Sequence, residues 1–559
     1  MAVLEVKDLT FKYNSTKEKV LDNVNFKINE GEFVVLCGES GCGKTTLLKL
    51  FKKQLAPYGE KSGEVLYNGT DISALDERIS VTDIGFVMQN PDNQIVTDKV
   101  WHELAFGLEN MGESISVIRR KVAEISGFFG ISDWYRKKTS ELSGGQKQLL
   151  ILASIMVMQP KVIILDEPTS QLDPIAASEF IATLKKINNE LGITILLVEH
   201  RLEEVFPIAS KAILMDKARV LLIDSPREVG KKLKNINGHK MNLGMPSSIR
   251  IFNQFDIDDE CPLTVREGKD FLNKHFNTEV KSLKIDKLNY ENREIALEIA
   301  EGYFRYERDL PDVLSGLNLK VYKNEMICIL GGNGAGKTTT LKILNGLKRL
   351  YRGKLRIWGK KIKEYNKNSL YRNNIASLPQ NPQTLFVKST VYEDLLEVTK
   401  IMEYDKKESK EMIADITEKL EIEHLYNRHP YDLSGGEQQK AAFAKILLMK
   451  PKIILLDEPT KGIDAYSKKV LADILAQLKQ EGITIVMVTH DIEFAAEHAD
   501  RCAMFFDGQI VSVETPVDFF SKNSYYTTAA SRISRQLYSN TITCDMVIRL
   551  CRENGEIYG

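Results

Sequence analysis

Short, uninterrupted hydrophobic runs mark this chain of 559 residues at regular places. Longer stretches of helical character separate them. Runs of four to six apolar residues are typical of parallel strands buried on both faces, with helices packed on each side of the sheet. The pattern therefore predicts an α/β fold, with strands at 33–37, 162–165, 193–198, 326–330, 453–456 and 483–488.

The composition excludes several classes of function. Lys and Arg number 76 against 77 Asp and Glu, a net charge of -1, which is too balanced for a protein that holds nucleic acid mainly by neutralising phosphates. The longest uncharged apolar stretch, 149–158, has about half of the ~20 residues that a membrane-spanning helix needs. Seven scattered cysteines without CxxC pairs predict neither a zinc site nor a disulfide framework. Because no signal-peptide pattern is present, we expect a cytosolic protein whose membrane role is carried by partners.

The chain repeats itself at a spacing of 290 to 293 residues. The repeated pairs are Lys44 and Lys337, Ser143 and Ser434, Asp166 and Asp457, and His200 and His490. A repeat of this length predicts two homologous domains in tandem. We expect them at 1–225 and 291–513, with a small helical appendage and linker at 226–290 and a C-terminal extension at 514–559. Thr264 and Glu267 fit a capping box that begins a helix in the appendage.

Each copy carries the pattern GxxxxGK[ST] after a predicted strand. Its glycines let backbone N–H groups approach phosphate oxygens at a helix N-terminus, where the helix dipole favours negative charge. Lys44 and Lys337 are expected to neutralise the β- and γ-phosphates, and the hydroxyls of Thr45 and Thr338 to ligate Mg²⁺. The predicted nucleotide-binding residues of the two loops are Gly38, Glu39, Ser40, Gly41, Cys42, Gly43, Lys44, Thr45 and Thr46, and Gly331, Gly332, Asn333, Gly334, Ala335, Gly336, Lys337, Thr338 and Thr339.

An Asp-Glu pair ends a buried strand in each copy. Asp166 and Asp457 are expected at the carboxyl ends of their strands, where ligands of open α/β sheets bind, and are predicted to hold Mg²⁺ directly or through water. The adjacent Glu167 and Glu458 are predicted general bases that accept a proton from the water that attacks the γ-phosphate. These residues indicate hydrolysis of a nucleoside triphosphate.

A Ser-Gly-Gly sequence precedes a long helical stretch in each copy. Ser143 and Ser434 can act as ordinary helix N-caps. Together with two side-chain-free backbone positions and the helix dipole, each serine also makes a second anion site. A nucleotide held there and on a P-loop would be clamped from two sides by two domains. The residues of this motif are Ser143, Gly144, Gly145, Ser434, Gly435 and Gly436.

In this order the motifs resemble those of the nucleotide-binding domains of ABC ATPases, over nearly all of 1–225 and 295–512. The resemblance implies, in each domain, a mainly parallel sheet core with an antiparallel β subdomain and a helical subdomain. It also implies that the two domains pair head to tail within the chain. The first P-loop would then share one ATP with Ser434, and the second would share another with Ser143.

The same resemblance assigns further residues. Gln89 and Gln380 match the Q-loop glutamine, which senses Mg²⁺ and the attacking water. His200 and His490 match the switch histidine that contacts the γ-phosphate. Because both copies keep the lysine, aspartate, glutamate and histidine, two working sites are expected.

Two weaker matches complete the set. Tyr13 and Tyr306 match the aromatic residue that stacks on adenine, the alternative being half-buried strand tyrosines. Segments 170–173 and 461–464 match the D-loop, although Lys461-Gly-Ile-Asp464 departs from the common sequence. The cross-talk that the resemblance implies for a D-loop is therefore expected of 170–173 before 461–464.

Several classes of ABC ATPase have tandem or paired domains. Ribosome-associated members join them by a long charged arm, but 225–290 holds only 12 Lys and Arg against 9 Asp and Glu, and the D-loops differ. DNA-repair members need a long coiled coil between P-loop and Ser-Gly-Gly motif, for which too few residues separate Lys44 from Ser143. Transport ATPases are favoured, and a tandem ATPase of a sugar importer is the alternative among them.

The sequence after the first Q-loop points to one transport class. Gln89-Asn-Pro-Asp-Asn-Gln-Ile-Val is similar to the ATPases of energy-coupling-factor (ECF) importers, and 245–267 resembles their C-terminal extension. The resemblance implies a fusion of two ATPase subunits at the cytoplasmic face of the cell membrane. Its partners would be an integral membrane coupling (T) protein and a substrate-binding (S) membrane protein, and no nucleic acid. The cargo would be a vitamin, a vitamin precursor or a metal ion.

Overall fold

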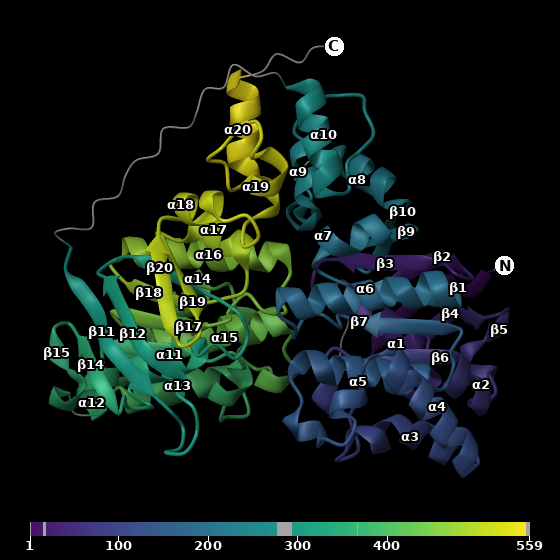
Figure 1. Ribbon diagram of the computed structural model, residues 1–559, viewed down its shortest axis with the longest axis horizontal. Coiled ribbons are helices and arrows are strands. Elements are labelled where there is room, and N and C mark those ends of the chain that lie inside the picture. Colours follow the sequence, from purple (N-terminus) through teal and green to yellow (C-terminus); the bar gives the residue numbers. More distant parts are fainter. Residues whose placement is uncertain (1, 15–17, 237, 277–292, 366, 555–559) are drawn as a thin grey trace. The chain divides into compact units, whose positions relative to one another are not determined.

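The computed structural model describes residues 2–14, 18–236, 238–276, 293–365 and 367–554. The chain forms two compact units, Met1–Thr264 and Val265–Gly559, and each is described by itself (Figure 1).

The first unit is built on a six-stranded sheet. Five of its strands run parallel, and the edge strand β10 is antiparallel to its neighbour β9. In sheet order the strands are β10 Arg219–Asp224, β9 Lys211–Asp216, β3 Phe33–Gly38, β8 Thr194–Val198, β7 Val162–Asp166 and β6 Ile84–Val87. Strands β3, β7 and β8 are buried along their whole length, as the uninterrupted hydrophobic runs predict.

A second, antiparallel sheet belongs to the same unit. Its strands are β2 Leu21–Asn29, β1 Ala2–Tyr13, β4 Gly59–Tyr67 and β5 Thr70–Asp71. Burial alternates along β2, so that one face is exposed and the other is packed. The packed face shares one hydrophobic core with α1 and with alternate residues of the parallel strands, among them Val34 and Leu36.

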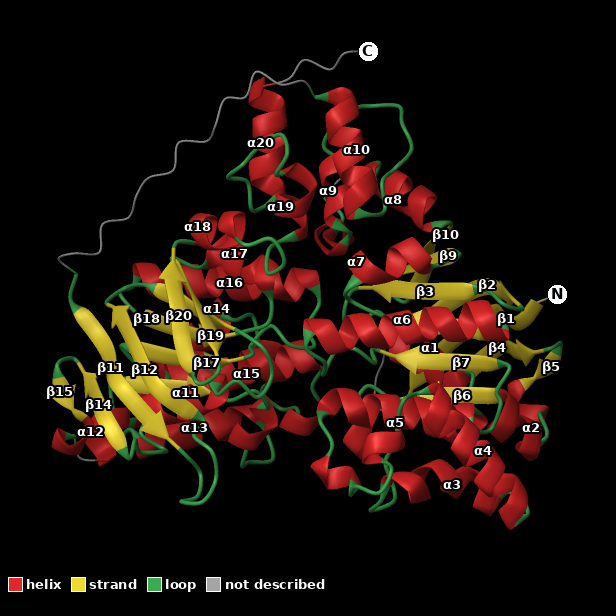
Figure 2. Cartoon of the chain, viewed as in Figure 1, coloured by secondary structure: helices red, strands yellow, loops and turns green. Residues whose placement is uncertain are grey.

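Helices cover both sheets and form a separate helical region (Figure 2). Helix α1 contacts β3 and β7, α6 contacts β8, and α5 contacts β6 and α3. The bounds are α1 Lys44–Leu50, α2 Glu77–Asp83, α3 Val100–Asn110, α4 Ile115–Phe128, α5 Gly144–Met156, α6 Pro174–Leu191, α7 Leu202–Val205, α8 Pro226–Lys234 and α9 Ser247–Phe252.

The second unit repeats this plan. Its core sheet is β16 Ile375–Leu378, β17 Ile453–Asp457, β18 Thr484–Val488, β13 Met326–Leu330, β19 Arg501–Phe506 and β20 Gln509–Glu514. Its antiparallel sheet is β12 Leu314–Tyr322, β11 Ile295–Phe304, β14 Arg352–Ile357 and β15 Lys360–Lys361. Two sheets and a helical region in each unit confirm the α/β class and the three-part domain that the family resemblance implies.

The helices of the second unit follow the same order, with additions at both ends. They are α10 Val265–His275, α11 Lys337–Leu344, α12 Lys367–Tyr371, α13 Val391–Ile401, α14 Lys406–Lys419, α15 Gly435–Leu447, α16 Ala465–Gln480, α17 Ile492–His498, α18 Pro516–Lys522, α19 Ala529–Ser534 and α20 Cys544–Asn554. None of the helices in the described part of the chain has both the length and the apolar character that crossing a bilayer requires.

The appendage helix α10 belongs to the second unit. It begins at Val265, directly after Thr264, and both Leu272 in the helix and Phe276 just beyond its end are buried. Its partner is α19 of the C-terminal extension. The end of the expected appendage, 277–290, lies outside the described residues.

The C-terminal extension has the same helical order as the appendage. Helices α8 and α18 both begin with a proline, after the N-caps Ser225 and Thr515. A six-residue helix and an eleven-residue helix follow in each case, α9 and α10 in the appendage and α19 and α20 in the extension. The repeat of the chain therefore extends beyond the two domains.

Candidate active site

The P-loops lie between a buried strand and a helix in both units. Gly43 and Gly336 take left-handed φ angles of 103° and 113°. A Cβ atom at Gly43 would lie 2.4 Å from the carbonyl oxygen of Val20, and one at Gly336 would lie 2.8 Å from that of Val313. Only glycine fits at either position, so the chain turns tightly into α1 and α11 with a bare backbone.

The two P-loop lysines fold back over their own loops. The Nζ atom of Lys44 donates to the carbonyl oxygens of Gly38 at 2.9 Å and Glu39 at 2.8 Å. Lys337 makes the same two bonds, to Gly331 at 2.9 Å and Gly332 at 2.8 Å. Both side chains are nearly buried, and each ammonium group is held above the loop on which phosphates are expected.

A threonine and an aspartate meet at the start of each P-loop helix. The hydroxyl of Thr45 donates to Asp166 at 3.1 Å, and that of Thr338 donates to Asp457 at 3.1 Å. Burial, followed by the charge of Glu167, raises the pKa of Asp166 to about 6. Burial also raises the pKa of Asp457. Mg²⁺ prefers hard oxygen ligands such as hydroxyls and carboxylates. Because each unit places one of each at hydrogen-bond distance, both threonine–aspartate pairs fit the ion.

The predicted bases contact the predicted switch histidines. The Nε2 atom of His200 lies 2.8 Å from Oε1 of Glu167, and that of His490 lies 3.0 Å from Oε1 of Glu458. The backbone N–H of each glutamate donates to a strand carbonyl. Both glutamates have left-handed φ angles, 47° at Glu167 and 53° at Glu458, which side chains rarely adopt and which cluster at functional sites.

The two Q-loop glutamines differ. Gln89 donates from Nε2 to Oε2 of Glu167 at 2.8 Å, so in the first unit it joins the predicted base. Gln380 is exposed, and its side chain makes no corresponding bond to Glu458 among the residues that the structure describes. The structure thus brings the catalytic set fully together in the first unit and leaves one member apart in the second.

The tyrosines expected at adenine stand beside the P-loop helices. The hydroxyl of Tyr13 lies 3.0 Å from that of Thr46, and Tyr306 has the same 3.0 Å contact with Thr339. Tyr306 is 49% exposed, so a large part of its surface is free for a ligand. Both tyrosines thus lie beside their P-loop helices, and stacking on adenine stays a prediction.

The Ser-Gly-Gly motifs begin α5 and α15. Ser143 and Gln146 form a complete capping box, as do Ser434 and Glu437. Each helix begins with the two glycines of its motif, which are Gly144 and Gly145 in α5 and Gly435 and Gly436 in α15. The capping role is therefore present in both copies, and contact with a nucleotide stays a prediction.

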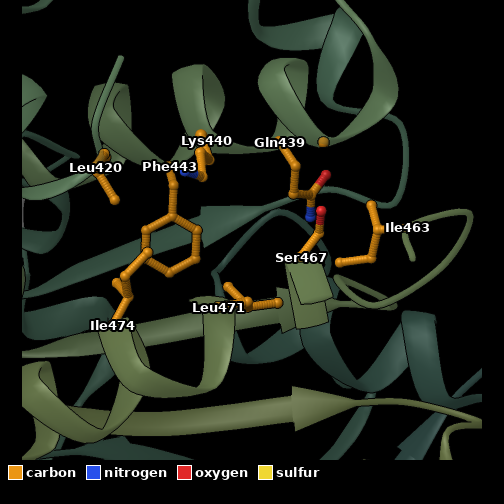
Figure 3. Close-up of a pocket in the computed structure, with 9 residues that line it drawn as sticks. Leu420, Gln439, Lys440, Phe443, Ile463, Ser467, Leu471 and Ile474 are labelled. Carbon is orange, nitrogen blue, oxygen red and sulfur yellow. The ribbon is translucent and has the colours of Figure 1, made fainter. Parts of the chain in front are cut away.

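A small cavity lies next to the second Ser-Gly-Gly motif. It has a volume of about 20 Å³ between α15 and α16, and Figure 3 shows Phe443, Ile463 and Leu471 pointing into it. Such a volume holds about one water molecule, far less than the roughly 300 Å³ of an ordinary ligand pocket. We therefore do not assign a ligand to it.

Three glutamates near the histidines carry no motif and were not singled out from the sequence. Glu199 precedes His200 and is buried. Glu203 and Glu493 each follow a predicted switch histidine by three residues, and their carboxylates accept from the backbone N–H groups of Ser247 and Ala529, both at 2.8 Å. The signal that the sequence offers for these glutamates is their position, directly before a predicted switch histidine or three residues after it.

Comparison with known proteins identifies the family. A protein-family model, described as ABC transporter, matches the chain twice, at 21–170 and 314–461. An ABC transporter ATP-binding protein of Bacillus anthracis is 41% identical over 554 residues, which cover 99% of both chains. One of Methanosarcina acetivorans is 32% identical over 548 residues, covering 91% of this chain and 84% of its own. The solved structure of cbiO1 from Clostridium perfringens, described as part of the ABC transporter complex cbiONQ, is 33% identical with a TM-score of 0.39, over 44% of this chain and 97% of its own.

The two matches of the family model and the similarity to the Bacillus anthracis protein over 99% of both chains confirm the family and the tandem repeat that the motifs predict. Members of this family bind ATP, generally with Mg²⁺, and work with membrane subunits. The chain belongs to the ABC transporter family, as an ATPase subunit with two tandem ATP-binding domains.

Proposed function

We propose that this ATPase is the motor subunit of an ECF-type importer. It couples ATP binding and hydrolysis at two sites to the uptake of a vitamin, a vitamin precursor or a metal ion through separate membrane subunits. The observation that carries the catalytic part is the contact between glutamate and histidine, which recurs in both units, at Glu167 and His200 and at Glu458 and His490.

The chemistry needs positioning and charge neutralisation more than covalent steps. Lys44 and Lys337 bind the β- and γ-phosphates. Each ammonium group thereby exchanges its bonds to the loop carbonyls for stronger bonds to negatively charged oxygens. Glu167 and Glu458 accept the proton of the attacking water, while the neighbouring imidazoles hold the carboxylates in place. The threonine and aspartate oxygens would hold Mg²⁺, which would supply neutralisation of the phosphate charge. Tyr13 and Tyr306 stack on adenine.

ATP shared between a P-loop of one domain and the Ser-Gly-Gly motif of the other is the proposed source of motion. Moving a two-state element from 1:99 to 99:1 needs about 5.5 kcal/mol of differential binding. Two triphosphates held from both sides can supply it, because each adds charge-assisted hydrogen bonds that only the closed state makes.

The proposed docking place of the membrane partner is a hollow beside the first Q-loop. Its volume is about 270 Å³, and it is lined by Lys52, Gln54, Leu55, Val81, Thr82, Ile84, Gly85, Phe86, Met88, Gln94, Ser154, Ile155 and Met158. The side chain of Gln94 accepts from the N–H of Met88 at 2.9 Å and donates to the carbonyl of Phe86 at 2.8 Å. These bonds hold the segment that follows Gln89 against residues that line the hollow. A movement of Gln89 would therefore be transmitted to the hollow.

The catalytic part is tested with both glutamates replaced. The E167Q/E458Q chain should bind ATP and lose turnover, because glutamine cannot accept the proton. Loss of roughly 100-fold or more in kcat with ATP still bound supports the role of the two bases. Hydrolysis at the normal rate would overturn it.

The transport part is tested by recovering the untagged chain from native membranes. The ECF proposal expects a small integral membrane coupling protein and a membrane-embedded binding protein. A matched variant, M158E in the hollow, should lose these partners while the isolated chain keeps its ATPase activity. Recovery with ribosomes, or with the permease of a sugar importer, would overturn the ECF assignment.

A further inference from the structure

A buried carboxylate lies next to the first switch histidine and has no counterpart in the second unit. Glu199 is 3% exposed at the end of β8, and the residue at the same place before His490 is Thr489. No Lys or Arg forms an ion pair with Glu199 in the described part of the chain. A buried carboxylate without an ion pair is costly to keep, so its bonds point to a specific task.

Glu199 joins two segments of the first site. Its Oε1 atom accepts from the backbone N–H of Thr169 at 3.0 Å and from the hydroxyl of Thr169 at 2.6 Å. Its Oε2 atom accepts from the backbone N–H of His200 at 3.2 Å. Thr169 lies two residues after Glu167, and it is 1% exposed. Burial raises the pKa of Glu199.

These bonds close a ring around the predicted base. The backbone N–H of Glu167 donates to the carbonyl of Val198, and its carboxylate contacts His200. Glu199, which lies between Val198 and His200, ties down the turn at Thr169. A charged acceptor makes hydrogen bonds about twice as strong as a neutral one, and more so in a buried place.

The second unit closes the same ring loosely. Thr460 takes the place of Thr169, and its hydroxyl lies 3.4 Å from that of Thr489. Thr489 accepts instead from the backbone N–H of Asp491 at 3.0 Å. One long contact between neutral groups thus replaces two short bonds to a carboxylate.

We propose that Glu199 is a positioning residue of the first ATP site, which holds Glu167 in place by tying the turn at Thr169 to the backbone of His200. The inference rests on the proposed role of Glu167 as the base. It makes the two sites unequal: hydrolysis at the first site depends on residue 199, and hydrolysis at the second does not depend to the same degree on residue 489.

The experiment places E199T and E199Q in a full chain whose second site carries E458Q, and T489V in a full chain whose first site carries E167Q, so that each kcat reports one site. E199T places the residue of the second unit in the first and removes both links, so kcat should fall about tenfold while KM for ATP stays unchanged, since neither Glu199 nor Thr169 belongs to a P-loop. E199Q keeps an acceptor oxygen for Thr169 and loses the bond to His200, so its kcat should lie between those of E199T and of the E458Q chain alone. T489V removes the 3.4 Å contact and the bond from the N–H of Asp491, neither of which has a charged acceptor, and should lower kcat less than E199T does.

A matched control separates positioning from stability. Glu32 directly precedes β3, at the amino ends of the strands of the same sheet, where its carboxylate accepts from Asn29 and pairs with Lys211 at 2.6 Å. E32Q should shift the unfolding temperature without changing kcat. E167Q is measured in the same E458Q chain, and unchanged turnover there would overturn both the base and the positioning role. If E167Q abolishes turnover but E199T leaves kcat unchanged, or lowers it no more than T489V, the positioning role alone is refuted.

Discussion

The Nε2 atom of His490 lies 3.2 Å from the Nζ atom of Lys337, within hydrogen-bond distance. In the first unit, among the described residues, Lys44 has no such contact with His200. Both histidines contact their glutamates, at 2.8 Å in the first unit and 3.0 Å in the second. The Nε2 atom of the second histidine therefore faces the phosphate-binding lysine as well as the predicted base, and it accepts from the lysine or donates to the glutamate according to its tautomer.

This difference predicts unequal effects of the two histidines on ATP affinity. Replacing either by Ala should lower hydrolysis at its own site by roughly 10- to 100-fold, since a hydrogen bond to a charged group is lost. H490A should also weaken ATP binding at the second site by about two- to tenfold, because Lys337 loses a neighbour that holds it. Nucleotide titrations in chains with K44A, which report the second site, and with K337A, which report the first, measure each affinity. Equal loss of affinity in H200A and H490A would contradict this link.

The left-handed glutamates store strain that can be measured. Glu167 has a φ angle of 47°, a conformation that costs a residue with a Cβ about 1–2 kcal/mol and costs glycine almost nothing. E167G and E167A both lack the carboxylate, so both should lose hydrolysis. E167G should nevertheless be more stable than E167A by about 1 kcal/mol, after the greater freedom of glycine in the unfolded chain is subtracted.

Calorimetry of the two variants checks this expectation. A difference of about 1 kcal/mol corresponds to roughly 2–4 °C in the unfolding transition of a unit of this size. The transition of the second unit provides the internal control, because it should not move. An E167A chain as stable as E167G would show that the turn is not strained.

The parts of the site that follow from the sequence are those set by local rules. An uninterrupted apolar run fixes a buried parallel strand, so Asp166 had to lie at a carboxyl edge. The spacing of glycines in GxxxxGK fixes a tight turn into a helix, so Lys44 and Thr45 had to lie at its start. Such local patterns determined the strands, the P-loops and the Asp-Glu pairs.

Other features depend on contacts between distant segments, which no local pattern encodes. The bond between Glu199 and Thr169 joins residues 30 positions apart in the chain. The packing of α10 against α19 joins the appendage to the C-terminal extension. The sequence signal that the extension copies the appendage is an N-cap residue followed by proline, at Ser225 and again at Thr515. This signal is short, and it has no apolar periodicity of its own.

The raised pKa of Asp166 predicts a pH dependence of Mg²⁺ use. Burial first, and the charge of Glu167 second, raise this pKa to about 6, above the ordinary value of 3.8. Mg²⁺ binds the ionised carboxylate, so the Mg²⁺ concentration for half-maximal hydrolysis should rise as pH falls below about 6, by up to roughly tenfold per unit. Mg²⁺ titrations at pH 5.5 and pH 8 measure this change, and a chain with the same Mg²⁺ requirement at both would contradict the prediction.

The same group affects stability with a definite sign. Because the folded protein binds this proton more tightly than the unfolded chain, the contribution of Asp166 is fully present below pH 3.8 and is lost as pH rises through about 6. The D166N chain has no such group. The difference in unfolding free energy between the natural chain and D166N, both without metal, should therefore shift in favour of D166N as pH rises from 4 to 7.

Glu203 and Glu493 connect the regions of the two histidines to the appendage and the extension. Glu203, in α7, accepts from the N–H and the hydroxyl of Ser247 at 2.8 and 3.3 Å, at the start of α9. Glu493, in α17, accepts from the N–H of Ala529 at 2.8 Å, at the start of α19. A carboxylate at a helix N-terminus satisfies an otherwise unpaired N–H and interacts favourably with the helix dipole.

Removing each carboxylate should loosen only the helix that it caps. Loss of a cap costs about 1 kcal/mol, so E203A should speed amide exchange in α9 roughly fivefold, and E493A should do the same in α19. E203Q keeps an acceptor oxygen and should restore most of the protection. E190A, which removes an exposed carboxylate near the end of α6, is the control and should leave α9 unchanged. Exchange measured by mass spectrometry decides the matter: if E203A leaves α9 protected, the glutamate does not hold the appendage to the segment that follows His200.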